Sequence, residues 1–229
     1  MNVALVLSGG CGSRVGADIP KQYLRVNGRT ILSYCLETLE GCESIDAIHV
    51  VAEEKWRDLI LEERWTKLRG FSKPGATRQF SVLNGLQDIS QYASETDIVV
   101  IHDAARPRVS SQLLERVIDA AKRHQGAMPV LKMKDTVYYS KDGERISSLL
   151  ERSCIYAGQA PEAFVFGSYY NANRSIDKTD FLKINGSTEP AIMAGLDIVM
   201  VEGEEENFKI TTGEDLERFR QSLEGSEQV

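Results

Sequence analysis

Short apolar segments alternate with segments of helical periodicity through the first part of the chain, and this alternation constrains the fold more than any other feature. The apolar segments predict strands at residues 3–7, 47–52, 97–101 and 127–131. The intervening periodicity predicts helices at residues 31–40, 54–68, 76–92 and 110–124. Because the strands are apolar throughout, both faces of their sheet should be covered by helices. The pattern therefore predicts an α/β fold with a mostly parallel sheet.

The alternation stops near residue 132. Residues 132–139 and 145–157 flank the pair Asp142-Gly143, which is a signal for a β-hairpin. A hairpin here has few core contacts, so we expect an arm over residues 132–157 that reaches outward and pairs with another subunit. A plain surface hairpin is the alternative. The rest of the chain predicts a helix at residues 161–173, a strand at 196–202 and a final helix at 212–223. No repeat or linker is found, so we expect residues 1–229 to form a single domain.

Composition excludes several classes of partner. The formal net charge of −7 leaves no broad basic face for nucleic acid, so an anionic ligand must be held by a local cluster of cations. No apolar run approaches the roughly 18 residues of a membrane span, and we expect no membrane partner. The cysteines lack a C-x-x-C pair and a nearby histidine, which argues against zinc and against a disulfide framework. We therefore expect the protein in the cytoplasm.

The first expected strand runs directly into a glycine-rich segment that also carries two cations. Its glycines allow the backbone to turn sharply and to direct N–H groups toward an anion, and Arg14 and Lys21 are close enough to clamp the same anion. The dinucleotide-binding fingerprint fails because its third glycine is replaced by Val15, and no Walker A string occurs. We expect a polyphosphate site of another kind; a glycine-rich turn with surface charges is the alternative.

A second polar segment follows the strand expected at residues 97–101. Asp103 lies where the carboxyl end of a parallel strand would place it, and such a carboxylate can hold Mg²⁺. Arg106 can turn to the same site and bind a phosphate in forked geometry. The alternative is that Asp103 caps its loop and pairs with Arg106. We interpret His102 as a packed residue at the strand end rather than a catalyst.

Two further segments belong to this set of candidates. Gly75 lies in a turn directly before a helix, where the backbone amides and the Ser81 hydroxyl can face a nucleobase. A simple helix start would look much the same. Lys209 lies in an extended segment before the last helix, and a solvated charge is the alternative there.

Six strings of these residues follow one another over nearly the whole chain, and together they resemble one family. The strings are Gly10-x-Gly12-x-Arg14 with Pro20-Lys21-Gln22, Arg78-x-x-Ser81-Val82 with Asn84-Gly85-Leu86, His102-Asp-Ala-Ala-Arg-Pro107, Asp135-Thr136, Gln159-x-Pro161 with Phe164, and Lys209-Ile-Thr-Thr-x-x-Asp-Leu216. The family is that of the cytidylyltransferases that activate sugar-alcohol phosphates. It includes the methylerythritol 4-phosphate enzymes of isoprenoid synthesis and the ribitol 5-phosphate enzymes of wall-polymer synthesis.

The resemblance implies a GT-A-like, Rossmann-like fold and a homodimer in which the arm crosses to the partner. It implies CTP and a polyol phosphate as substrates, Mg²⁺ as cofactor, and transfer of CMP with release of pyrophosphate. By this match the nucleotide would be bound by Ser8, Gly9, Gly10, Gly12, Ser13, Gly75, Ala76 and Ser81. The match assigns catalytic charge to Arg14, Lys21 and Lys209, the metal to Asp103, and the acceptor to Arg106, Thr136 and Arg152. Lys209 would also contact the acceptor phosphate, and Arg152 would be contributed across the dimer.

The chain departs from the family pattern at three places. Pro74-Gly75 stands where the family usually has Gly-Gly, and Ala160-Pro161-Glu162 stands where it has Thr-Pro-Gln. A threonine-aspartate segment is expected near residues 185–189, where the match is shortened. The last two departures lie where the acceptor should bind, so the match specifies nucleotide transfer better than it specifies the acceptor.

The acceptor itself is expected to be 2-C-methyl-D-erythritol 4-phosphate, because the string at residues 102–107 resembles that branch. Residues 156–159 resemble the ribitol branch, so ribitol 5-phosphate or another sugar or polyol phosphate is the alternative. Two alternatives come from other classes: a CTP-binding protein whose acceptor site has decayed, and a nicotinamide-dependent oxidoreductase, which the failed fingerprint disfavours.

Overall fold

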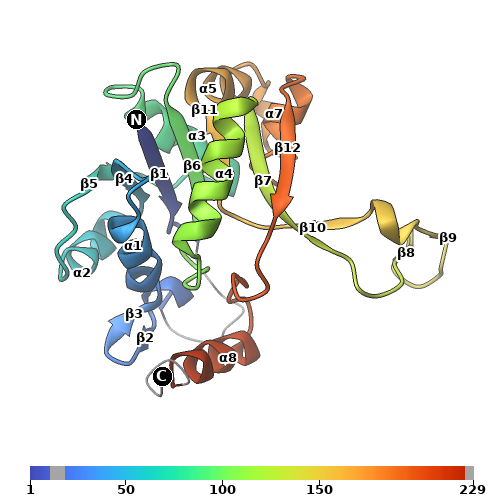
Figure 1. Ribbon diagram of the computed structural model, residues 1–229, viewed down its shortest axis with the longest axis horizontal. Coiled ribbons are helices and arrows are strands. Elements are labelled where there is room, and N and C mark those ends of the chain that lie inside the picture. The colour runs from blue at the N-terminus through green and yellow to red at the C-terminus, as the bar shows by residue number, and fades with distance from the viewer. Residues whose placement is uncertain (11–18, 225–229) are drawn as a thin grey trace.

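The computed structural model describes residues 1–10 and 19–224, and one large sheet organises this part of the chain (Figure 1). Eight described strands form the sheet: β1 (Asn2–Leu7), β4 (Ala47–Val51), β5 (Leu68–Ser72), β6 (Ile98–Asp103), β7 (Gly126–Lys132), β10 (Tyr156–Gly158), β11 (Glu162–Val165) and β12 (Ile198–Glu202). Their order is β10-β7-β11-β6-β1-β4-β5, and β12 pairs with β7.

Most of these strands run in the same direction. β1 is parallel to β4 and β6, β4 is parallel to β5, and β12 is parallel to β7. Only β10 and β11 are reversed: β11 lies antiparallel between β6 and β7, and β10 is antiparallel to β7. The expected α/β fold with a mostly parallel sheet is therefore confirmed.

Helices cover both faces of the sheet, as the apolar strands predicted. Figure 1 shows α4 (Ser111–Arg123) in front of the sheet and α3 (Arg78–Ile89) behind it. α1 (Ile31–Gly41) shares the face of α4, and α5 (Phe166–Arg174) shares the face of α3. Within β1, Ala4 and Val6 belong to the α1–α4 core, whereas Val3 and Leu5 belong to the α3–α5 core. The strand is thus buried on both sides, which explains its unbroken apolar run.

Two expected helices were partly wrong. The helix expected at residues 54–68 is only the short turn η3 (Glu54–Trp56) and α2 (Arg57–Ile60). Trp65 donates its indole N–H to the carbonyl oxygen of Ile60 at 2.9 Å, and the chain then forms β5 at the sheet edge. The helix expected at residues 161–173 begins only at Phe166, because its first part is β11. In the second case backbone pairing with the neighbouring strands β6 and β7 outweighs local helical propensity.

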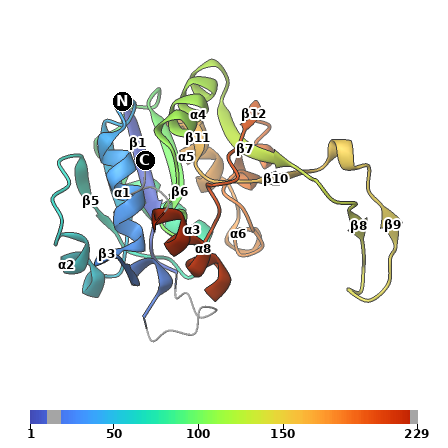
Figure 2. The ribbon, with the colours of Figure 1, turned by 60° about the horizontal axis from the view of Figure 1, so that its bottom comes forward.

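The expected arm is present as a hairpin. β8 (Tyr138–Tyr139) pairs with β9 (Ser148–Leu149), and η4 (Arg152–Cys154) leads back to β10. Gly143 has a φ of +78°, which is the left-handed conformation that this turn requires of its glycine. The arm extends away from the rest of the described chain in both ribbon views (Figures 1 and 2). It is slightly shorter than predicted, because β7 continues to Lys132 and β10 begins at Tyr156.

A third, smaller core attaches the C-terminal helix. The remaining described elements are η2 (Lys21–Tyr23), β2 (Arg25–Val26), β3 (Arg29–Thr30), α6 (Lys178–Phe181), α7 (Glu189–Met193) and α8 (Gly213–Glu224). Phe219 of α8 packs with Ile31 and Ile210, and the Ile210 amide donates to the carbonyl oxygen of Ala105 at 2.8 Å. These contacts hold the segment that carries Lys209 against the end of β6. None of the described helices is long and apolar enough to cross a membrane.

Candidate active site

A cavity lies at the carboxyl ends of β1 and β6. Leu7 and Asp103 are paired in the register of these two parallel strands, so both strands end at the same level. Open α/β sheets bind ligands at this edge. The cavity has a volume of about 400 Å³ and is lined by Leu7, Gly9, Gly10, Lys21, Gln22, Gly75, Ala76, Thr77, Arg78, Ser81, Asp103, Ala104, Ala105 and Lys209.

A side chain of η2 holds the residues that follow β1 in place. Gln22 donates its side-chain amide to the carbonyl oxygens of Ser8 and Gly10, each at 2.8 Å. Gly9 lies against Pro74, and a Cβ at Gly9 would lie 2.5 Å from the Pro74 Cβ. The departure from the family's Gly-Gly pattern at residue 74 therefore places a rigid ring against Gly9.

The turn before α3 is preformed by its own hydrogen bonds. The Gly75 amide donates to the Ser81 hydroxyl at 2.9 Å, and that hydroxyl donates to the carbonyl oxygen of Thr77 at 3.0 Å. The Thr77 side chain caps the helix by accepting from the Phe80 amide. A Cβ on Gly75 would lie 2.7 Å from the Phe80 carbonyl carbon, so only glycine fits here. The turn presents a rigid wall to a ligand.

Asp103 is the centre of a charged cluster. Its Oδ1 accepts from Arg78 Nη2 at 3.0 Å, and its Oδ2 accepts from Lys209 Nζ at 2.9 Å. Arg106 Nε lies 3.7 Å from the same Oδ2. Three cations thus surround one carboxylate whose side chain is only 11% exposed. The cluster carries excess positive charge, which suits a polyphosphate ligand in a protein of negative net charge.

The same contacts determine protonation at the end of β6. Burial raises the pKa of Asp103, but the charges of Arg78 and Lys209 outweigh it and hold that pKa far below its usual range. The carboxylate is therefore ionised at neutral pH. Burial lowers the pKa of His102 to about 4, so its imidazole is neutral, and Nε2 donates to the Arg106 carbonyl oxygen at 3.1 Å. His102 is fully buried, which confirms it as a packed strand-end residue.

The cavity brings together eight of the candidate residues chosen from the sequence. These are Gly9, Gly10, Lys21, Gly75, Ala76, Ser81, Asp103 and Lys209. Arg106 lies beside Asp103 but does not line the cavity, because its Nη1 donates to the carbonyl oxygen of Asn207 at 2.6 Å. Gly12, Ser13 and Arg14 lie outside the described residues.

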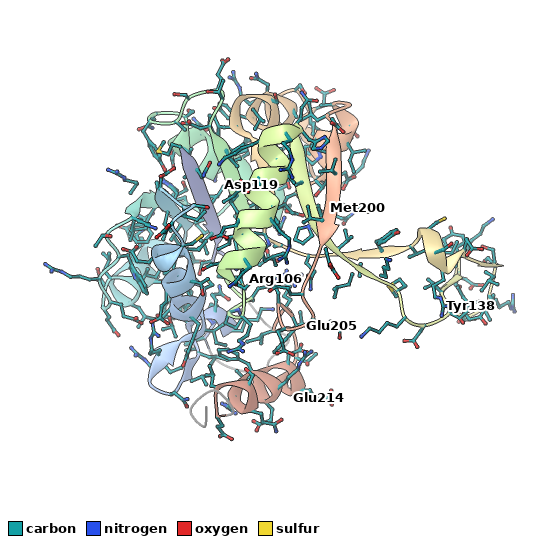
Figure 3. The ribbon with its side chains drawn as sticks, in the orientation of Figure 1. Arg106, Asp119, Tyr138, Met200, Glu205 and Glu214 are labelled. Atoms are coloured by element: carbon teal, nitrogen blue, oxygen red, sulfur yellow. The ribbon has the colours of Figure 1, made fainter. Side chains whose placement is uncertain are left out.

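Three candidates do not reach the cavity of their own chain. The Ser8 amide donates to the Val51 carbonyl oxygen, and its hydroxyl donates to the Tyr23 hydroxyl at 2.9 Å. Its polar groups are therefore used inside the fold. Thr136 and Arg152 are exposed on the arm, and Arg152 donates to the carbonyl oxygen of Lys134 at 2.9 Å. Figure 3 shows the same separation, with Tyr138 far out on the arm and Arg106 near the site.

Arg78 is a cavity residue to which sequence reasoning gave no role. It is the first residue of α3 and follows the Gly75 turn closely, which was the available signal. Its other partner, the Ser187 hydroxyl, lies more than a hundred residues further along the chain, and no sequence pattern pointed to it. Glu162 and Thr188 near it were recognised only as departures from the family pattern.

Fold and site together define a class. A cationic cavity walled by glycine turns, at the carboxyl edge of a mostly parallel sheet with helices on both faces, is typical of nucleotide-binding α/β enzymes. The chain belongs to the 2-C-methyl-D-erythritol 4-phosphate cytidylyltransferase family, whose model matches residues 2–224. These enzymes are nucleotidyltransferases that use CTP, so the oxidoreductase alternative is not supported.

Relatives of both branches are similar to the chain. A 2-C-methyl-D-erythritol 4-phosphate cytidylyltransferase of Geobacter metallireducens is 37% identical over 221 residues, covering 93% of each chain. A ribitol-5-phosphate cytidylyltransferase of Streptococcus agalactiae serotype V is 31% identical over 226 residues, covering 96% of this chain and 94% of the relative.

Solved structures share the fold over nearly the whole chain. The 2-C-methyl-D-erythritol 4-phosphate cytidylyltransferase of Francisella tularensis superposes with a TM-score of 0.82 at 27% identity, covering 96% of this chain and 98% of that one. The enzyme of Thermus thermophilus has a TM-score of 0.75 at 28% identity, with the same coverage. The GT-A-like, Rossmann-like expectation is thus confirmed.

Proposed function

We propose that the protein transfers CMP from CTP to 2-C-methyl-D-erythritol 4-phosphate with release of pyrophosphate. The observation that carries this proposal is the meeting of Gly9 and Gly10, the Gly75 turn, Asp103 and Lys209 around one cavity. The acceptor is supported by the family match and by the Geobacter metallireducens relative. Ribitol 5-phosphate is the second candidate, which the Streptococcus agalactiae relative supports.

The chemistry needs no protein nucleophile, because the acceptor phosphate is already anionic. One of its oxygens attacks the α-phosphorus of CTP in line, the bond from that phosphorus to the bridging oxygen breaks, and pyrophosphate leaves. The protein contributes positioning and charge stabilisation. Lys21 and Lys209 neutralise charge that develops on the phosphate oxygens, and Arg14 is proposed to act with them.

The residues at the site fit Mg²⁺ held by one carboxylate. Asp103 is ionised and lines the cavity. No group of three or more metal-ligating side chains occurs among the described residues, so substrate phosphates and water would complete the ligand shell. Mg²⁺ commonly binds in this way, through one or two carboxylates. When bound, it would supply further neutralisation of phosphate charge. Arg78 and Lys209 are the donors that it would compete with at Asp103.

We also propose a homodimer whose arm reaches the partner's cavity. The arm exposes large apolar side chains, and the side chains of Tyr138, Ile146 and Leu149 are each more than half exposed. Such a patch is typical of an interaction surface. Thr136 and Arg152 lie on this arm and not in their own cavity. A second copy would give both residues a cavity to act in.

Mixing two inactive variants tests whether Arg152 acts across the dimer. The variants are Lys21→Ala and Arg152→Ala, combined under conditions that allow subunits to exchange. A mixed dimer would contain one intact site, so random exchange should restore about a quarter of wild-type turnover. Lys21→Ala mixed with Lys209→Ala is the matched control, because both residues line the same cavity and no intact site can form. Equal, low activity in both mixtures would contradict the trans role.

Pyrophosphate release tests the function itself. Purified protein and Mg²⁺ would be combined with each of the four NTPs and, separately, with 2-C-methyl-D-erythritol 4-phosphate or ribitol 5-phosphate. We expect release with CTP and the methylerythritol acceptor. Release only with ribitol 5-phosphate would assign the other branch. CTP binding without release on either acceptor would support the alternative of a decayed acceptor site.

Two broader expectations remain proposals. We propose that residues 1–229 form one nucleotidyltransferase domain, which one continuous sheet supports. We also propose a cytoplasmic protein, because the described cysteines, Cys35, Cys42 and Cys154, are free thiols.

A further inference from the structure

Arg78 connects three segments that lie far apart in the sequence. From the start of α3, its Nη2 and Nε donate to Asp103 Oδ1 at 3.0 and 3.4 Å, and its Nη1 donates to the Ser187 hydroxyl. The Glu162 carboxyl also lies near the guanidinium: burial raises the pKa of Glu162, and the charge of Arg78 opposes that rise. Arg78 is thus held by charge and by hydrogen bonds at the boundary between α3, the end of β6 and residues 187–188.

Residues 187–188 form a fixed, buried support for Arg78. Both are buried, and the Tyr169 hydroxyl donates to the Ser187 carbonyl oxygen at 2.8 Å. The Thr188 hydroxyl donates to Glu162 Oε1 at 3.2 Å. Glu162 is 6% exposed, and its other oxygen, Oε2, is buried without a hydrogen-bond partner among the described residues. The two positions where the chain departs from its family near the acceptor are therefore in direct contact with each other.

The guanidinium retains binding capacity. It has five N–H groups, of which three are used on Asp103 and Ser187. Its side chain is 33% exposed and lines the cavity, so the remaining donors are available to an anion there. Paired N–H groups of arginine match the oxygens of a phosphate.

The sheet order indicates which phosphate this is. The order is β11-β6-β1, so Gly9 and Gly10 after β1 lie on one side of Asp103 and Glu162 lies on the other. In-line attack places the acceptor phosphate opposite the leaving pyrophosphate. If the glycine segment and Lys21 hold the leaving group, the β11 side receives the acceptor. Arg78 is tied to that side through Ser187 and Glu162.

Resting on the proposed function, we propose that Arg78 binds the phosphate of the acceptor. Ser187 and the Glu162–Thr188 pair are positioning residues for it. In this role Arg78 binds the phosphate monoester group that every candidate acceptor contains. In this pair Glu162 supplies a carboxylate and Thr188 supplies a hydrogen-bond donor, and the two groups form one buried contact.

The test of Arg78 compares the effect of a substitution on acceptor binding with its effect on CTP binding. In Arg78→Gln the KM for the acceptor should rise about 10- to 100-fold, because one charge-assisted phosphate contact is lost. The KM and Kd for CTP should change less than about threefold, which corresponds to well under one such contact. Arg78→Lys, which keeps the charge but not the fork, should fall between. Arg174→Gln is the matched control, since Arg174 is exposed at the end of α5 and outside the cavity. An equal rise in both KM values, or no rise in either, would overturn the proposal.

The positioning pair has its own test. Glu162→Gln should raise the acceptor KM, because the contact to Thr188 then lacks its carboxylate. Adding Thr188→Asp should lower that KM again, since the amide introduced at position 162 can donate to the new carboxylate across the same contact. A double variant no better than the single would remove the pair from this role. Thermal unfolding of each variant identifies any that fail to fold.

Failure of the proposed function can be distinguished from failure of the Arg78 assignment. If the wild type turns over neither acceptor, the function fails, and Arg78 is then tested by titrating inorganic phosphate into the CTP-loaded protein. Weaker phosphate binding by Arg78→Gln or Arg78→Lys than by Arg174→Gln would support the assignment. Equal binding by all three would overturn it.

Discussion

Replacing Lys21 by alanine is expected to lower the kcat of CMP transfer by at least about 100-fold, the usual effect of removing one group that stabilises transition-state charge. Lys21 lines the cavity from η2. Its neighbours Gln22 and Tyr23 are buried and hold η2 in place, so the substitution should remove charge without moving the backbone. Steady-state pyrophosphate release at saturating CTP and acceptor measures the change.

A lysine outside the cavity provides the control for this prediction. Lys55 is 66% exposed and pairs with Glu53 at 2.9 Å beside the Trp56 ring. Lys55→Ala removes the same charge from the same side of the molecule, and kcat should stay within about twofold of wild type because exposed pairs contribute little. Near-normal turnover in Lys21→Ala would remove Lys21 from the mechanism.

Replacing Asp103 by asparagine is expected to abolish turnover and to lower the free energy of unfolding by about 3 kcal/mol, as when one partner of a buried ion pair is lost. The change leaves Arg78, Arg106 and Lys209 around a neutral side chain. Urea denaturation at pH 7 without metal ions measures the stability. Asp119→Asn is the control, because Asp119 is exposed on α4 (Figure 3). Its Oδ1 forms only an exposed ion pair, 3.9 Å from Lys122 Nζ. Its effect should be within about 0.5 kcal/mol.

The stability difference should depend on pH in one direction. The pKa of Asp103 is lower in the folded protein than in the unfolded chain, where an aspartate titrates near about 3.9. Its stabilisation is therefore present above about pH 4 and is lost as the pH falls below that value toward the folded pKa. Wild type and Asp103→Asn should differ most at neutral pH and converge in acid. A difference that stays constant from pH 7 to pH 3 would contradict the ionised cluster.

The elements best predicted from the sequence are those whose burial is decided locally. β1, β4, β6 and β7 are apolar on both faces, and α1, α3 and α4 repeat apolar residues at helical spacing, so each pattern has one reasonable interpretation. β5 and β11 were missed because their residues are charged or helix-compatible by themselves. They become strands only because β4, β6 and β7 offer unpaired backbone groups beside them.

The sequence by itself determined which strand ends carry polar residues, and hence that the glycines after β1 and Asp103 would meet, since parallel strands place their carboxyl ends at one edge. Lys209 follows no strand of the sheet directly, and only the family resemblance placed it at the same site. The tertiary structure alone decided the partners within the site. It turned the Ser8 hydroxyl to Tyr23, and it joined Arg78 to Ser187 across more than a hundred residues. Such contacts depend on how distant segments pack in three dimensions, and neither periodicity nor spacing along the chain records that packing.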